Sequence, residues 1–249
     1  MMLSNMISIT QASSLQSPAS SLIPNLLTLT IFIATSLCRA NQPTAETLLQ
    51  EARLRPTTHP MTLAATIRGG EEALPLTFKI EKSHISYQLH DPDETILLTL
   101  EPTSSLVSDF KNGKSSVMSD ERRYQDIRGT GVTYDDLSLG FLYWPHPRLA
   151  GKETLRGIKA SIVELTPPAH HTSPYGSARL WIDQNSGAPL RMEGWNQQGQ
   201  LVKRFEVISA QKIDGLWMLQ EMRIETFDQA TGKVIQRRYF TISRNAYKL

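Results

Sequence analysis

The sequence predicts a mainly β protein, in which an antiparallel sheet curls, closes mostly on itself and has an apolar concave face. After Met61, apolar and polar residues alternate with a period of two along most of the chain, and short turn signals separate the alternating segments. Short links join antiparallel neighbours. Only two segments have a helical pattern. Helices therefore cannot cover a flat sheet of about ten strands, and the sheet must curl.

The first forty residues differ in composition from the rest, and we expect residues 1–40 to be a signal peptide. They contain no Asp, Glu or Lys and a single arginine, Arg39. Leu26–Leu37 is an apolar run that is too short for a membrane span but suits a signal peptide, and Cys38 and Ala40 are small residues before a cleavage point. No Lys or Arg precedes Leu26, so an uncleaved N-terminus stays an alternative. We expect the chain to be exported.

Charge and cysteine content exclude several classes of protein. The chain has 26 Lys and Arg against 24 Asp and Glu, and no long block of like charge, so nucleic acid is not an expected partner. Cleavage after Ala40 would remove Cys38, the single cysteine, and with it any disulfide or thiol nucleophile. Leu37 stands where a lipoprotein signal needs a small residue, which argues against lipidation.

Residues 41–60 are expected to form an N-terminal helix and a linker, and residues 61–249 the domain of the curled sheet. Thr44–Leu54 has the pattern of an amphipathic helix, with Thr44 as its N-cap and Pro56 closing it. The apolar residues at helical spacing are Ala45, Leu48, Leu49 and Ala52.

The strand pattern is clearest at residues 83–89, where Ile85, Tyr87 and Leu89 share one face. Asn112-Gly113 is a signal for a type I′ hairpin turn. Further strands are expected at Leu76–Ile80, Thr95–Leu100, Leu106–Phe110, Ser115–Met118, Leu155–Leu165, Ala178–Asp183, Leu190–Trp195, Val202–Ile208, Trp217–Phe227 and Val234–Ser243.

One segment between the strands, residues 134–145, has a different character. Thr133 and Asp136 have the spacing of a helix start, in which the threonine caps the helix and the aspartate lies in its first turn. The helix dipole favours negative charge there, so capping is a better interpretation of Asp135 and Asp136 than a catalytic acid–base pair. The large apolar residues of the segment indicate a short apolar helix; they are Tyr134, Leu137, Phe141, Leu142 and Trp144.

No catalytic or metal-binding motif is present in the sequence, so we expect no enzyme, no metal and no cofactor. Residues 129–131 (GTG) lack the third glycine and the preceding buried strand of a nucleotide-binding loop. The histidines, among them adjacent His170-His171, form no metal-binding motif. An enzyme would need a pocket with a His–carboxylate pair, for example with His84 or His90, and stays the least favoured alternative.

A pattern of short stretches extends over most of residues 69–242. It consists of residues 126–130 (DIRGT), 134–137 (YDDL), 141–145 (FLYWP), Tyr175, 180–183 (LWID), 203–207 (KRFEV), 215–217 (GLW) and 222–224 (MRI). This pattern resembles the outer-membrane lipoprotein-sorting (LolA-like) proteins of the bacterial envelope. The resemblance implies an incomplete barrel that is apolar inside, with helices as a lid, and a carrier of the acyl chains of lipoproteins. It also implies a location in the periplasm, with association with the outer membrane left open. The lumen-facing arginine that helps to hold the lid in such carriers is not matched.

The expected function is that of a periplasmic carrier of lipid or acylated lipoprotein in outer-membrane lipoprotein sorting. Acyl chains offer about 0.8 kcal/mol per buried CH₂ and no hydrogen bonds, so a site for them needs apolar area and exclusion of water. We expect the apolar residues of segment 134–145 to cover the mouth of the sheet, and four residues to line its interior: Leu180, Leu216, Met218 and Met222. Expected partners are inner- or outer-membrane transport components, and the expected state is a monomer. The alternative is a non-catalytic envelope binding or scaffold module with a filled core.

Overall fold

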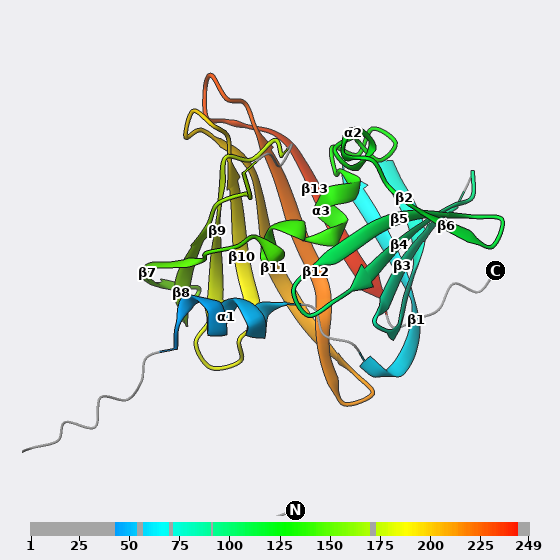
Figure 1. The fold of residues 1–249 in the computed structure, drawn as a ribbon, viewed down its shortest axis with the longest axis horizontal. Helices are drawn as coiled ribbons and strands as arrows, with labels where there is room; N and C mark the ends of the chain where they lie inside the picture. The colour runs from blue at the N-terminus through cyan, green and yellow to red at the C-terminus, as the bar shows by residue number, and fades with distance from the viewer. Residues whose placement is uncertain (1–42, 54–56, 70–71, 91, 170–172, 244–249) are drawn as a thin grey trace, which may run out of the picture. The chain divides into compact units, whose positions relative to one another are not determined.

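The computed structural model describes residues 43–53, 57–69, 72–90, 92–169 and 173–243. The predictions for the signal peptide, Cys38 and His170-His171 lie outside these ranges. Within them, thirteen strands form one antiparallel sheet that is not closed into a barrel (Figure 1). This confirms the predicted mainly β fold with an open sheet.

The strand order explains where the sheet is open. It is β6-β5-β4-β3-β2-β1-β13-β12-β11-β10-β9-β8-β7, so β6 and β7 are the two edges and β1 pairs with β13 in the middle. The strands are β1 (Thr57–Gly69), β2 (Glu72–Lys82), β3 (His84–Leu89), β4 (Glu94–Leu100), β5 (Ser105–Lys111), β6 (Lys114–Val117), β7 (Arg148–Leu155), β8 (Ile158–Leu165), β9 (Ser177–Asp183), β10 (Pro189–Trp195), β11 (Leu201–Ile213), β12 (Leu216–Phe227) and β13 (Val234–Ser243).

The chain between the two edge strands crosses the open side of the sheet. Residues 118–147 leave β6 at one edge and must reach β7 at the other (Figure 1). They contain α2 (Asp120–Arg123), α3 (Tyr134–Ser138) and the 3₁₀ helix η1 (Gly140–Tyr143). The topology therefore brings the predicted apolar segment across the sheet, and we call α3, η1 and Trp144 the lid.

The helix predicted before the first strand is α1 (Ala45–Ala52). The Oγ1 atom of Thr44 caps it by accepting a hydrogen bond from the N–H of Thr47 at 3.1 Å. Its apolar residues are buried in the main hydrophobic cluster of the sheet. α1 is thus part of the core of the domain, and β1 begins at Thr57 instead of at Met61.

The strand predicted over Leu155–Leu165 begins too early, because β8 starts only at Ile158, after a hairpin turn. Arg156 and Gly157 have φ angles of 49° and 83°, and they connect β7 to β8. Their sequence lacks the Asn or Asp that usually marks such a turn. The turn predicted at Asn112-Gly113 is confirmed, with φ angles of 52° and 74° between β5 and β6.

Alternate residues of each strand face opposite sides of the sheet. On β9, Ala178, Leu180 and Ile182 belong to the main hydrophobic cluster, whereas Trp181 belongs to a small cluster on the other face. The main cluster contains residues of α1, the lid and both halves of the sheet. The sheet therefore curls around this cluster, and the concave face is the apolar one.

The outer face carries charged and aromatic side chains. Glu206 of β11 contacts Arg191 at 3.1 Å, Arg156 at 3.3 Å and Arg223 at 2.5 Å. The guanidinium carbon of Arg191 lies 5.5 Å from the centre of the Trp181 ring. Buried carboxylates below partly exposed arginines allow this face to meet solvent.

Candidate functional site

The five predicted lid residues all lie in the main hydrophobic cluster, with between 1% and 7% of their surface exposed. α3 begins with a capping box, as the sequence predicted. The Oγ1 atom of Thr133 accepts a hydrogen bond from the N–H of Asp136 at 3.1 Å, and the Asp136 carboxylate accepts one from the N–H of Thr133 at 2.8 Å. The capping interpretation of Asp136 is confirmed.

Asp136 has a second role that the sequence did not reveal. The Nζ atom of Lys203, on β11, lies 2.5 Å from Asp136 Oδ2 and 2.9 Å from the carbonyl oxygen of Gly131. The hydroxyl of Tyr175 donates a hydrogen bond to Asp136 Oδ1 at 3.0 Å. Lys203, Asp136 and Tyr175 are all buried. Burial and the neighbouring carboxylate raise the pKa of Tyr175 well above its ordinary value, so its phenol stays neutral and donates.

Lys203 therefore ties the lid to the concave face of the sheet. It lies two residues before Phe205, which belongs to the main hydrophobic cluster, so both side chains point inward. The alternation of β11 indicates this inward direction in the sequence, but nothing local identifies Asp136 as the partner.

Further polar contacts hold the lid along its length. The Tyr87 hydroxyl donates to the carbonyl oxygen of Leu137 at 3.0 Å, and Arg53 Nε, just after α1, donates to that of Leu142 at 2.9 Å. The Tyr134 hydroxyl donates to Glu94 at 2.8 Å. Burial and the hydrogen bond to Glu94 raise the pKa of Tyr134 to about 12, so this donor too is neutral.

Asp135, the other aspartate of α3, is also buried and forms an ion pair with Arg123 of α2. Arg122, the preceding residue of α2, contacts Glu94 at 2.8 Å and Asp109 at 2.9 Å. Both aspartates of the lid are therefore held in structural contacts.

Three of the four predicted lining residues contact the interior. Leu180 is fully buried in the main cluster, and Met218 and Met222 are partly buried against it. Leu216 stands apart, because it lies next to the β11–β12 turn and is 39% exposed. Its cross-strand partner Ile213 is buried in the main cluster, so Leu216 is on the same face as Met218, and its exposure results from its position at the end of the hairpin.

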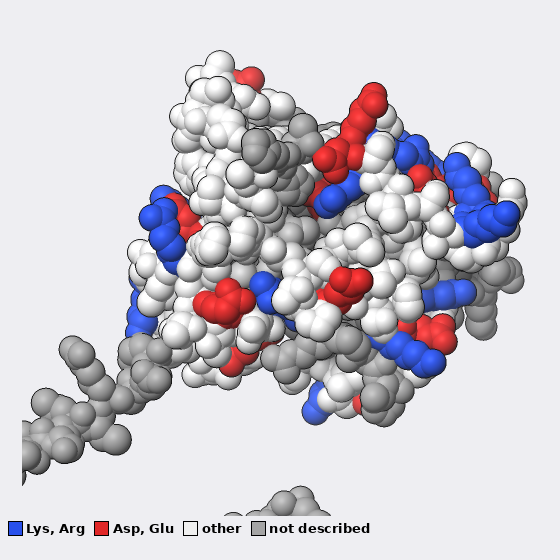
Figure 2. Space-filling model, in the orientation of Figure 1, with Lys and Arg blue, Asp and Glu red and all other residues white. Residues whose placement is uncertain are grey.

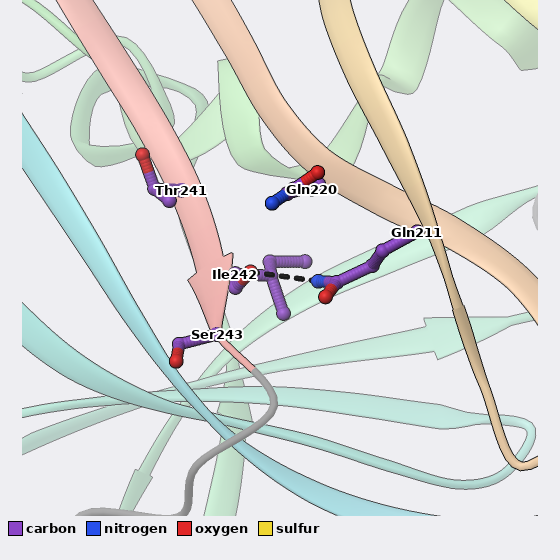
Figure 3. Close-up of a pocket in the computed structure, with 5 residues that line it drawn as sticks. All are labelled: Gln211, Gln220, Thr241, Ile242 and Ser243. Atoms are coloured by element: carbon purple, nitrogen blue, oxygen red, sulfur yellow. Dashed lines mark hydrogen bonds between the residues drawn. The ribbon is translucent and has the colours of Figure 1, made fainter.

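The described hollows lie at another part of the sheet. A hollow of about 460 Å³ is lined by Gln211, Gln220, Thr241, Ile242 and Ser243 (Figure 3). A second, of about 390 Å³, is lined by residues 60–63 and 212–214. None of the nine predicted lid and lining residues contributes to either.

The larger hollow marks a place where two strands separate. The pairing of β12 with β13 ends at Glu221 and Thr241. Beyond this point Gln211 Nε2 donates a hydrogen bond to the carbonyl oxygen of Ile242 at 2.7 Å (Figure 3). A side chain thus replaces a missing contact between strands.

The histidines named as candidates do not form an acid–base pair in the interior. His90 shares a hydrogen bond of 3.0 Å with Thr77 Oγ1, and its Nδ1 atom lies 3.9 Å from the exposed carboxylate of Asp93. His84 is exposed. In the described ranges no group of three or more His, Cys, Asp and Glu residues is arranged to hold a metal ion.

Charges on the face that carries α1 and α3 are mixed, with Lys and Arg interspersed among Asp and Glu (Figure 2). Among the residues that the structure describes, no helix combines the length and the apolar character that crossing a membrane requires.

The open sheet, its apolar concave face and the lid across it define a LolA-like half-barrel. A LolA superfamily protein from Nitrosomonas europaea superposes with a TM-score of 0.56 at 17% identity, over 80% of this chain and 91% of that one. A domain assigned to outer-membrane lipoprotein sorting, from Vibrio parahaemolyticus, superposes with a TM-score of 0.56 at 16% identity. The match covers 74% of this chain and 82% of that one. A DUF1329 family protein from Desulfovibrio piger superposes with a TM-score of 0.51 at 17% identity, over 74% of this chain and 83% of that one. At these identities the likeness concerns the fold.

The chain belongs to a family described as uncharacterized proteins, whose model matches residues 102–241. No curated protein matches its sequence. The matched region begins after β4 and includes the lid and β7 to β12.

Proposed function

We propose that this chain is a periplasmic carrier of lipid or acylated lipoprotein, which holds acyl chains against the concave face of the sheet when the lid opens. The observation that carries the proposal is a lid with apolar side chains on the concave face and a buried ion pair, Lys203 with Asp136, that fastens it there. A carrier needs a large apolar surface, which must be covered when no cargo is bound.

In the absence of cargo, the lid can cover the apolar surface that acyl chains would otherwise contact. Its apolar side chains, such as Leu137 and Phe141, occupy space against the sheet. An acyl chain that took this space would regain their apolar contacts at about 0.8 kcal/mol per buried CH₂. The cargo would then shift a closed form toward an open one in proportion to its greater affinity for the open form.

The local structure of the lid supports such an exchange. α3 has five residues and η1 has four, lengths that have little helical stability of their own. Leu139 between them has φ +49°, a left-handed conformation that costs about 1–2 kcal/mol for a residue with a side chain. The lid therefore depends on its contacts with the sheet and can leave when these are replaced.

Acyl chains are proposed to contact the lid residues together with Leu180, Met218 and Met222, and Leu216 is left out because it is exposed. We further propose that residues 1–40 direct export and that the carrier acts as a monomer with membrane transport components in outer-membrane lipoprotein sorting. This role rests on the fold that the chain shares with the domain from Vibrio parahaemolyticus, and fold alone does not determine function.

The test is displacement of a fluorescent fatty acid from delipidated protein, with native mass spectrometry of the protein as purified. Lys203→Met removes the ion pair that fastens the lid and should increase fatty-acid affinity. Lys159→Met, at an exposed position on β8, is the matched control and should behave as wild type. Circular dichroism checks that each variant is folded. The absence of lipid in both assays, for wild type and for Lys203→Met, would refute a carrier.

A non-catalytic module with a filled core is the second candidate. It is favoured by the burial of all five lid residues and by the position of the two hollows away from them. A folded Lys203→Met variant that binds no lipid would support this module.

A further inference from the structure

The end of the β11–β12 hairpin exposes two adjacent apolar side chains. Asp214-Gly215 form a two-residue turn with φ angles of 49° and 86°, and Ile213 pairs with Leu216 across it. Leu216 is 39% exposed and Trp217 is 74% exposed. Figure 1 shows that this end of the hairpin projects beyond the adjacent strands. It has no part in the lid described above.

We infer that this hairpin end contacts lipid bilayers by inserting Leu216 and Trp217 into the membrane surface. The indole ring has an apolar body and one N–H donor, which is why tryptophan is enriched at membrane–water interfaces. Leucine at the neighbouring position adds apolar area for the acyl region. The inference concerns membrane contact and does not depend on whether the interior holds cargo.

The small size of the exposed pair favours a bilayer over a protein partner. A stable protein–protein interface needs about 800 Å² from each partner, whereas one Trp and one Leu side chain supply a fraction of that. A bilayer accepts a narrow apolar tip, because insertion needs only that the inserted side chains leave water.

The charges beside the tip define what kind of membrane contact this is. Lys212 and Asp214 flank it with opposite signs, so attraction to anionic lipid is not the driving force. Binding should therefore occur on phosphatidylcholine vesicles and should persist at high salt, which screens exposed charges.

The hairpin is held firmly behind its tip. Ile213 is buried in the main hydrophobic cluster, and Gln211 is bonded to the carbonyl oxygen of Ile242 on β13. Substitution of the two exposed residues should therefore leave the fold intact, because surface positions change stability by less than about 0.5 kcal/mol.

The test is co-sedimentation of the protein with phosphatidylcholine vesicles. The double variant Leu216→Ser/Trp217→Ser should lower the partition coefficient at least about tenfold, because two apolar side chains no longer leave water. The matched control is Val234→Ser/Ile235→Ser, two adjacent residues at the start of β13 that are 39% and 65% exposed. This control should partition as wild type.

A second readout locates the contact. Brominated lipids should quench tryptophan fluorescence in wild type but not in Trp217→Phe, because Trp144, Trp181 and Trp195 are less exposed. The inference is overturned if wild type does not bind, if both double variants lose binding equally, or if binding requires anionic lipid and disappears with salt. Fatty-acid displacement without vesicles tests the carrier separately.

Discussion

The concave and outer faces of the sheet are built from the same strands, but the concave face is apolar and the outer face is charged. On β11, Phe205 faces the main hydrophobic cluster and the next residue, Glu206, contacts three arginines on the outer face. The concave face depends on being covered, by α1 and by the lid. The outer face remains in solvent, because its carboxylates lie below arginines that cover them. The comparison shows that only the concave face needs a lid, and this is the face on which the proposed carrier would hold its cargo.

Removal of a large side chain from the concave face should have the largest effect. Phe240→Ala should lower the free energy of unfolding by about 4 kcal/mol, because it leaves a cavity in the main cluster. Urea denaturation measures the loss. Ile235→Ala, on the same strand but 65% exposed, is the control and should change stability by less than about 0.5 kcal/mol. Equal losses would contradict the assignment of the faces.

The ion pair of the lid is a buried charged contact on the concave face, and its contribution to the free energy of unfolding can be compared with that of Glu206 on the outer face. Lys203→Met should cost about 3 kcal/mol, because the buried carboxylate of Asp136 loses its cation. The double variant Lys203→Met/Asp136→Asn should recover part of the loss, since no unpaired charge remains. Urea denaturation gives the totals, and hydrogen exchange of the amides of α3 shows whether the loss is local. A Lys203→Met variant as stable as wild type would contradict a buried ion pair between Lys203 and Asp136.

On the outer face, Glu206→Gln should cost about 2 kcal/mol, because Arg156, Arg191 and Arg223 lose their shared carboxylate. Burial by itself raises the pKa of Glu206, but the three arginines lower it below its ordinary value of 4.5. The carboxylate thus contributes its stability fully above this value and loses it as the pH falls through the lowered pKa. The difference between wild type and variant should be constant near pH 7 and shrink below about 4.5. A difference that grows in acid would contradict the network.

The smallest expected effect concerns the start of the lid helix. Thr133→Ala should cost about 1 kcal/mol, because the N–H of Asp136 loses its acceptor. Thr133→Ser keeps the hydroxyl and should behave nearly as wild type. Thermal unfolding of both variants measures the difference. If Ala and Ser destabilise equally, the methyl group and not the cap is responsible.

Sequence reasoning succeeded where the information is local. The alternation in β3, the turn at Asn112-Gly113 and the capping of α3 by Thr133 each depend on residues a few positions apart. It failed at β7, whose residues are mostly exposed and show no alternation, and at the turn of Arg156-Gly157.

The polar contacts between the lid and the sheet could not be predicted, because they join residues far apart in the chain. Lys203 and Asp136 are 67 positions apart, and Tyr87 and Leu137 are 50 apart. The exposure of Leu216 follows from its position beside the β11–β12 turn, which the alternation of residue types alone does not indicate. The five apolar lid residues could be predicted, because a short apolar helix between strands must bury its side chains against the sheet.

The pairing of β1 with β13 joins strands that are far apart in the chain. Every other pairing in the sheet joins strands that are consecutive in the chain, so each half can grow by local hairpins. During synthesis β13 emerges after the other twelve strands, and until then β1 exposes its backbone groups as an open edge that could pair with another chain. A nascent chain of this protein is thus prone to aggregation at β1 until β13 has been synthesised, and a chaperone would have most to protect at that strand.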